Sequence, residues 1–292
     1  VDTGPGQYKD MTKDVAKIDK IIEKLKTTRF KREVMEECSR LFYDSTFPRD
    51  IDEGRFLIGF DNGVFDLERM SFRPGMPDDY ITLSVGYDFI EYTGDEPVFD
   101  EINGFFEKIQ CKKNVREYVF RACAAHLVGG NRENIVFFWT GTGSNGKSTA
   151  MRLLKKVFGK YFGTAPITLI TRKQKGAGSA TPELASLKGV RMLSLNEPEG
   201  DENIFSSMLK QLSGEDDVSV RQLYEKCFDY TPQFMMNIIC NDLPRIVSVD
   251  GGTWRRPRVI PWESEFVEKE SDVTEDYQFV KDLSVVSRMD DW

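Results

Sequence analysis

The chain has 292 residues, of which 40% are hydrophobic and 30% charged, and its formal net charge is −8. This length suffices for one large or two modest domains, and no run approaches the roughly 18 apolar residues of a membrane span. The first residues lack a signal-peptide pattern, so we expect a soluble, intracellular protein without a membrane partner. The negative charge argues against a wholly basic nucleic-acid-coating surface, although it permits a locally basic channel.

The cysteines and the single histidine exclude several kinds of site. The five cysteines are scattered without C-x-x-C spacing, which argues against zinc knuckles and a disulfide framework. The one histidine, His126, lies in the apolar helical stretch 119–128, where we expect a packed or surface side chain. A metal site rich in histidine is therefore excluded.

Helical periodicity dominates residues 9–43. Val15, Ile18, Ile22 and Leu25 share one face, and lysines occupy the opposite face. We expect this lysine-rich face to be solvated, and a nucleic-acid contact is the alternative.

From Arg55 the pattern changes to short β-like segments. Residues 56–60 and 64–67 flank an Asn-Gly turn, which predicts a hairpin. A loop is expected at 73–79 and a further strand at 80–88. Residues 99–109 and 115–128 are expected to be helices that lead to the next strand.

A glycine-rich loop follows the apolar run 135–139 and precedes an amphipathic helix at 150–158. Its residues match G-x-x-x-x-G-K-[ST], the loop whose backbone N–H groups surround nucleotide phosphates. In this assignment Lys147 reaches the β- and γ-phosphates of ATP and the Ser148 hydroxyl ligates Mg²⁺. The predicted cofactor-binding residues are Gly141, Thr142, Gly143, Ser144, Asn145, Gly146, Lys147, Ser148 and Thr149.

Apolar runs on both sides of this loop predict an α/β fold with a mainly parallel five-stranded sheet. The expected strands are residues 135–139, 166–170, 190–195, 234–239 and 257–260.

Acidic residues follow the third of these strands, where α/β sheets bind ligands. Glu197 is the candidate for the Mg²⁺-linked carboxylate that activates water, with Glu199 as the second choice. The alternative is that both belong to an acidic surface loop.

Two further polar signals follow the fourth strand. Asn241 is placed to orient water against the γ-phosphate. Arg255 and Arg256 follow a turn, and a guanidinium can bridge phosphate oxygens in a transition state. Ordinary surface arginines are the alternative interpretation.

Together these segments resemble the superfamily 3 helicases, which are AAA+ ring ATPases. Within that group the chain is most similar to the primase-helicases of large DNA viruses of the poxvirus and African swine fever virus kind, and to their phage relatives. The segments that carry the resemblance are residues 57–67, 141–149, 187–199, 209–224, 241–244 and 252–261.

The resemblance implies a sheet ordered 5-1-4-3-2, a homo-hexameric ring, and ATP sites shared between neighbouring subunits. It implies Lys147 and Ser148 as the Walker A residues, Glu197 as the Walker B acid and Asn241 as the polar sensor. It also favours Arg256 over Arg255 as the arginine that reaches the neighbour's ATP.

The segment 218–228 predicts two short strands around a polar tip, and the resembled helicases project a hairpin at this place into the ring's pore. Lys226 and Arg221 can pair with phosphates and Tyr224 can stack on a base of single-stranded DNA. A solvated turn with Tyr224 in the core is the alternative.

The resemblance also suggests how the chain is organised. We expect an N-terminal helical and β-rich module at 1–110, an ATPase domain at 111–265, and the start of a truncated C-terminal segment at 266–292. The primase domain that usually precedes this ATPase in the family is absent, so we expect an excised fragment of a protein with a fused primase.

The leading hypothesis is an ATP-driven DNA helicase, encoded by a virus and acting at replication forks in infected cells. A ring that only assembles or loads on DNA without unwinding it is one alternative. A monomeric P-loop phosphotransferase is the other.

Overall fold

The computed structural model describes residues 5–94, 97–172, 181–196, 203–224, 227–247 and 250–292. The chain divides into two compact units, Val1–Pro48 and Arg49–Trp292. The first unit contains the helices α1 (Pro5–Leu25) and α2 (Thr28–Leu41), which confirms the predicted helical segment. The apolar face of α1 is exposed, with Val15 and Ile18 each retaining more than half of their accessible surface. No helix in the described ranges is long and apolar enough to cross a bilayer.

The short helix α3 (Phe47–Asp50) spans the boundary between the two units, and a small antiparallel sheet follows it in the second unit. In this sheet β1 (Leu57–Phe60) pairs with β2 (Gly63–Asp66), so the predicted hairpin is confirmed. The third strand is β3 (Ser71–Arg73). The strand predicted at 80–88 is wrong, although this segment follows β1 with two backbone hydrogen bonds, Val85 N to Gly59 O and Asp61 N to Tyr87 O. Gly86 has a left-handed φ of 86°, which interrupts a regular ladder.

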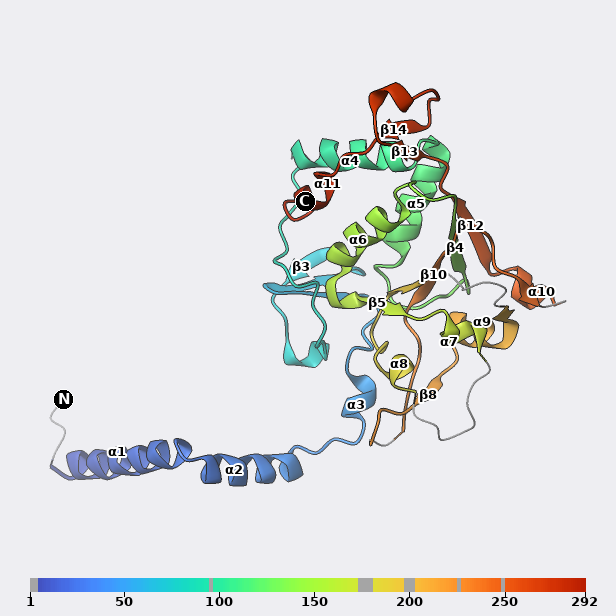
Figure 1. Ribbon diagram of the computed structural model, residues 1–292. Coiled ribbons are helices and arrows are strands. Elements are labelled where there is room, and N and C mark those ends of the chain that lie inside the picture. The colour runs from blue at the N-terminus through green and yellow to red at the C-terminus, as the bar shows by residue number, and fades with distance from the viewer. Residues whose placement is uncertain (1–4, 95–96, 173–180, 197–202, 225–226, 248–249) are drawn as a thin grey trace. The chain divides into compact units, whose positions relative to one another are not determined.

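A five-stranded parallel sheet forms the centre of this unit (Figure 1). Its strands lie in the order β12-β4-β10-β6-β5, and each neighbouring pair is parallel. The predicted α/β class with a mainly parallel sheet is confirmed. The strand bounds are Val136–Thr140 for β4, Phe162–Ala165 for β5, Met192–Leu195 for β6, Met235–Ile239 for β10 and Pro257–Pro261 for β12.

The second strand of this sheet differs from its prediction. The expected strand at 166–170 is wrong, because residues Thr168–Thr171 form the helix α7 and the strand is β5. Ile167 and Ile170 are both buried, and their spacing of three places them on one side of a helical turn. Apolar runs this short fit a buried helix as well as a buried strand.

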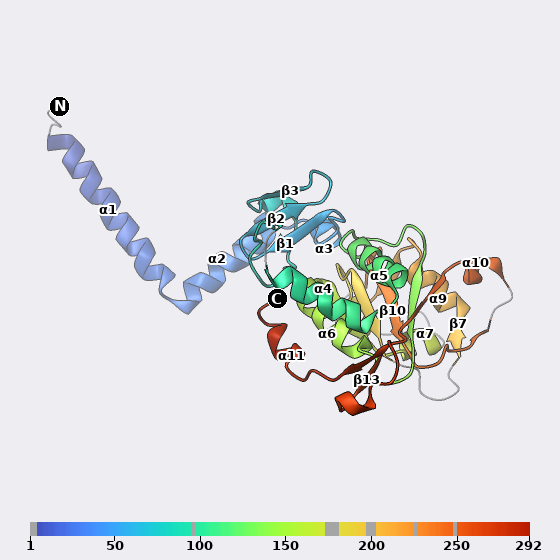
Figure 2. The same cartoon turned by 90° about the horizontal axis from the view of Figure 1, so that it is seen from above.

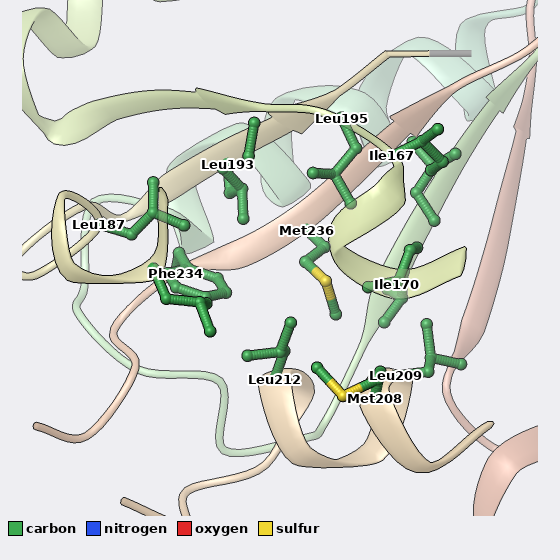
Figure 3. Packing of buried hydrophobic residues seen from close by; sticks show 14 of the residues in the cluster. Ile167, Ile170, Leu187, Leu193, Leu195, Met208, Leu209, Leu212, Phe234 and Met236 are labelled. Carbon is green, nitrogen blue, oxygen red and sulfur yellow. The ribbon is translucent and has the colours of Figure 1, made fainter. Parts of the chain in front are cut away.

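Helices cover both faces of the sheet (Figures 1 and 2). Alternate residues of β4 point to opposite cores: Val136 and Phe138 belong to one cluster, and Phe137 and Trp139 to the other. The first cluster is closed by α7, α8 (Pro182–Ala185) and α9 (Ser206–Ser213), as Figure 3 shows. The second is closed by α4 (Pro97–Ile109), α5 (Lys113–Ala125) and α6 (Lys147–Phe158).

A buried arginine joins the small sheet to the large one. Arg191, the residue just before β6, is 2% exposed, and its guanidinium donates to the carbonyls of Gly54, Leu57 and Leu127. It also lies over the Tyr161 ring, 4.7 Å from the centroid. Burial lowers the pKa of Arg191 to about 10, so the group remains charged at neutral pH.

Shorter elements complete the unit. The pairs β7–β11 and β13–β14 are parallel, and β8–β9 is antiparallel. The bounds are Pro77–Asp79 (η1), Gly159–Tyr161 (η2), Ile204–Phe205 (β7), Val218–Val220 (β8), Phe228–Tyr230 (β9), Ile246–Val247 (β11), Gly251–Trp254 (α10), Glu265–Val267 (β13), Glu270–Asp272 (η3), Gln278–Val280 (β14) and Val285–Arg288 (α11).

Candidate nucleotide-binding site

The glycine loop lies between the inner strand β4 and helix α6, as predicted. Gly146 precedes α6 with a left-handed φ of 85°, and a Cβ there would lie 2.5 Å from Ile109 Cγ2. Glycine is therefore required at this position on both conformational and steric grounds. By contrast, a Cβ on Gly143 would meet nothing within 4 Å, so this side of the loop is open to a ligand.

The segment after β12 braces the loop. The Phe266 backbone N–H donates to Ser144 O at 2.7 Å, and the Asn145 side-chain amide donates to Trp262 O at 3.3 Å. Asn145 is 3% exposed, and Trp262 stacks on Trp139 of β4 with the ring centroids 5.0 Å apart. These contacts brace the loop from the segment that follows β12.

The groups that would face phosphates fit an anion. Lys147 is 5% exposed and its ammonium group contacts the Gly141 carbonyl, so a cation is held inside the loop. Helix α6 has twelve residues, its N-cap residue is Gly146, and its first N–H, that of Lys147, donates to Asn145 Oδ1 at 3.4 Å. The dipole of the helix favours a negatively charged ligand at this end.

A cleft of about 500 Å³ extends from the Ser148 side of this helix. Thr164 of β5, Ser194 of β6 and Asn196, which follows β6, line this cleft. Arg152 and Lys155 line it from α6. The sequence interpretation missed these two cations, although Arg152 follows Ser148 by four residues and the helical period places both on one face.

The predicted carboxylates Glu197 and Glu199 lie outside the described residues. Asn196, the residue before Glu197, lines the same cleft as Ser148. Asn241 is exposed and follows β10, which lies between β4 and β6. Among the described residues, no group of three or more His, Cys, Asp or Glu side chains could hold a metal ion.

The two candidate arginines have opposite environments. Arg256 is 7% exposed, and its guanidinium donates to Ser213 Oγ at 3.0 Å, to Asn134 Oδ1 at 3.0 Å and to the Gly252 carbonyl. Burial lowers its pKa, and the charge of Arg255 acts in the same direction. Arg255 itself is exposed. The donors of Arg256 are engaged within its own chain, which argues against its predicted role as the group that reaches another subunit; that role stays a prediction.

The predicted hairpin is present as β8 and β9. Tyr224, between these strands, is fully exposed and has a left-handed φ of 67°, so it does not lie in the core. Arg221 is half-buried, and its backbone exchanges hydrogen bonds with Thr181. Lys226 lies outside the described residues.

His126 is a packed histidine in a polar core network. Its Nδ1–H donates to Ala122 O at 2.6 Å, because a carbonyl can only accept, and its Nε2 accepts from the Asn237 amide at 2.9 Å. The Asn237 carbonyl oxygen accepts from Trp139 Nε1 at 3.2 Å. Burial lowers the pKa of His126 to about 4, so the ring is neutral. The network fixes the register of α5 against β4 and β10.

Two family models match the chain. Residues 7–111 match the family described as D5 N terminal like, and residues 139–256 match a family of unknown function, DUF5906.

Viral proteins are among the curated relatives. "Putative helicase L207/L206" of Acanthamoeba polyphaga mimivirus is 40% identical over 97% of this chain and 30% of its own length. "Putative helicase 121R" of Invertebrate iridescent virus 3 is 36% identical over 87% of this chain and 27% of its own length. "Putative primase C962R" of African swine fever virus (isolate Warthog/Namibia/Wart80/1980) is 25% identical over 78% of this chain and 24% of its own length. The chain thus spans about a third or less of the relatives it matches.

Among solved structures, the A form apo structure of the NrS-1 C-terminal region is 15% identical and covers 68% of this chain and 44% of that chain, with a TM-score of 0.48. A TM-score of this size supports no assignment.

Proposed function

Because the chain is related to the D5-type primase-helicases of large DNA viruses, we propose that it is the ATP-hydrolysing motor of a viral DNA helicase. One observation carries the proposal: the glycine loop connects β4, an inner strand of the parallel sheet, to the helix α6, with Lys147 held inside the loop. This is the arrangement that phosphate binding requires.

The strand order supports the AAA+ and superfamily 3 assignment. Numbered along the chain, the five strands of the sheet lie in the order 5-1-4-3-2. With this assignment we propose a homo-hexameric ring, in which ATP binds between neighbouring subunits.

The glycine loop and the first residues of α6 fit ATP and Mg²⁺. Lys147 and the N–H groups of the loop would hold the β- and γ-phosphates, and the Ser148 hydroxyl would hold Mg²⁺ together with Glu197. The bound metal supplies charge neutralisation at the γ-phosphate. Glu197 takes a proton from the attacking water, Asn241 orients that water, and Glu199 remains a second candidate for the carboxylate.

We assign the trans-acting arginine to Arg255. It is exposed after α10, whereas Arg256 holds that turn against Ser213 and Asn134. A guanidinium that is free to leave its own subunit can neutralise charge on a neighbour's triphosphate.

The β8–β9 hairpin is the proposed contact to single-stranded DNA. Tyr224 offers a fully exposed ring for base stacking, and Lys226 and Arg221 would pair with phosphates. Such contacts read no sequence, so DNA binding would be non-specific and would weaken as the salt concentration rises.

The remaining parts of the proposal concern the whole protein. Since the chain spans 24% to 34% of its curated relatives, we propose that a primase domain is fused to it in the complete protein. Action at viral DNA replication sites in the infected cell follows from the same relationship.

The first test is Lys147→Ala. ATP turnover should fall by at least about 10²-fold, because the variant loses a preorganised charge on the phosphates. Release of inorganic phosphate measures this, with Lys160→Ala, an exposed lysine just after α6, as the matched control. Normal turnover in Lys147→Ala would refute the site.

Product and strand analysis separate the alternatives. A motor leaves ADP and free phosphate, whereas a phosphotransferase transfers the labelled phosphoryl group to an acceptor. Displacement of a strand from a forked duplex distinguishes unwinding from a ring that only loads on DNA.

A further inference from the structure

The cleft beside Ser148 carries two cations that the proposed function does not use. Ser148, Arg152 and Lys155 occupy positions i, i+4 and i+7 of α6 and all line the cleft, so they lie on one face of the helix. With a rise of 1.5 Å per residue, the two cations follow Ser148 by about 6 Å and about 10 Å along the helix axis. The charges therefore form a row that leads away from the position proposed for the γ-phosphate.

Hydroxyl groups of the sheet line the same cleft. Thr164 of β5 and Ser194 of β6 are register partners in the parallel sheet. Phe162 and Met192 pack in the cluster that α6 closes, and side chains alternate along a strand, so Thr164 and Ser194 point to the α6 face. Ser194 is 6% exposed, and no described residue forms a hydrogen bond with its hydroxyl group. A buried hydroxyl is thus open to a ligand in the cleft.

The charge of the cleft is positive. No aspartate or glutamate is among the described residues that line it. Arg152 and Lys155 are exposed and form no ion pair with a described carboxylate, whereas the neighbouring Lys156 pairs with Asp290. A guanidinium, an ammonium and hydroxyl groups around one hollow of about 500 Å³ are donors that suit an oxyanion.

We propose that this cleft binds inorganic phosphate, the product that hydrolysis of ATP forms beside Ser148, and that Arg152 and Lys155 hold it while ADP still occupies the glycine loop. This inference rests on the proposed function. When water attacks the γ-phosphorus and loses its proton to Glu197, the bond to the ADP oxygen breaks, so an anion is left next to Ser148. The row of cations offers this anion a binding site on its way to solvent.

The double variant Arg152→Gln/Lys155→Gln tests the proposal. It removes both charges and keeps residues that favour a helix, and the fold should tolerate it because both side chains are exposed. With saturating ADP and Mg²⁺, we expect the dissociation constant of inorganic phosphate to rise about tenfold or more. Equilibrium dialysis with radiolabelled phosphate measures this value.

A non-hydrolysable ATP analogue separates direct contact from a general loss of positive field. The analogue carries more negative charge than phosphate, so a weaker field would reduce its affinity at least as much. If the two cations contact the product directly, the dissociation constant of the analogue should rise less than that of phosphate. Titration calorimetry measures the analogue.

Two single variants complete the test. Lys156→Gln is the matched control, since it removes the same charge one residue along α6 but outside the cleft, and phosphate binding should stay unchanged. Thr164→Val removes a hydroxyl group from the cleft and keeps the branched shape of the side chain. It should weaken phosphate binding by several-fold, as the loss of one hydrogen bond predicts.

The outcomes separate this inference from the proposed function. If the natural chain does not hydrolyse ATP, the proposed function fails, and this inference fails with it. If the chain hydrolyses ATP but binds no phosphate beside ADP, or if the double variant binds phosphate normally, the inference alone is overturned. An equal loss in Lys156→Gln, or a larger loss for the analogue than for phosphate, would also overturn it. Normal phosphate binding with impaired subunit association in light scattering would assign the cleft to an acidic side chain of a neighbouring subunit.

Discussion

Arg255 and Arg256 are adjacent in the chain, yet only one of them is available to a partner. Arg256→Ala would leave Ser213, Asn134 and the Gly252 carbonyl without their donor. We expect the free energy of unfolding to fall by about 2–3 kcal/mol. Arg255→Ala should leave stability within about 0.5 kcal/mol, because its side chain is exposed.

Arg255→Ala also tests the proposal that neighbouring subunits share the ATP site. Arg255→Ala should lower ATP turnover by about 10³-fold or more while nucleotide binding survives. Mixing it with Glu197→Gln subunits should restore part of the activity if the arginine acts on a neighbour. Urea denaturation measures the free energy of unfolding of each variant, and release of inorganic phosphate measures its ATP turnover. Full turnover in Arg255→Ala would contradict the assignment.

His126 makes stability depend on pH. Its pKa is about 4 in the folded chain and about 6.5 when unfolded, so the unfolded state binds more protons between these values. Stability is therefore lost as the pH falls through 6.5 towards 4, by about 2 kcal/mol between pH 7 and pH 5.

His126→Gln isolates this effect, because an amide can accept from Asn237 and donate to Ala122 without titrating. Denaturation at pH 7 and at pH 5 should show a loss that is about 2 kcal/mol smaller in the variant. Equal losses in the two proteins would show that His126 is not the titrating group.

For single residues, the sequence predicts the chemical role of a side chain better than it predicts whether that side chain is buried. The spacing of Gly141, Gly146 and Lys147 defines the loop, because each glycine has a local conformational reason. The burial of Arg256 depends on Ser213 and Asn134, which are far away in the chain, and no local pattern reports them.

Among the elements, prediction succeeds where the local signal is strong. The Asn-Gly turn specifies the β1–β2 hairpin, and short runs of mainly apolar residues specify β4, β6, β10 and β12. The strand β5 was missed because its sequence Phe-Gly-Thr-Ala carries little apolar signal. Its place is set by tertiary contacts: a Cβ on Gly163 would lie 2.9 Å from Val190 Cγ1, so the strand needs a small residue there.

At the apolar segment 166–170, by contrast, a strand is predicted where the structure has a helix. Its side chains do enter the core, as the strand prediction requires, but from the helix α7 and not from the sheet. Burial was predicted correctly and secondary structure was not, because hydrophobicity drives both and the length of the run does not distinguish them.

At the scale of the whole molecule, the two compact units should be separable. Every apolar side chain that is buried in the described part of the chain lies at or after Ile58. Removing residues 1–48 should therefore shift the melting temperature of the remaining chain by less than about 2 °C, which calorimetry measures. A larger fall would mean that α1 and α2 contribute to the core of the second unit.

The carbonyl cluster around Arg191 has a mechanical consequence. A guanidinium stays protonated at physiological pH, so two backbone segments, at Gly54–Leu57 and at Leu127, remain bonded to the residue just before β6. These bonds stiffen the junction between the β1–β2 hairpin and β6, so we expect the hairpin to follow any displacement of β6 as one body.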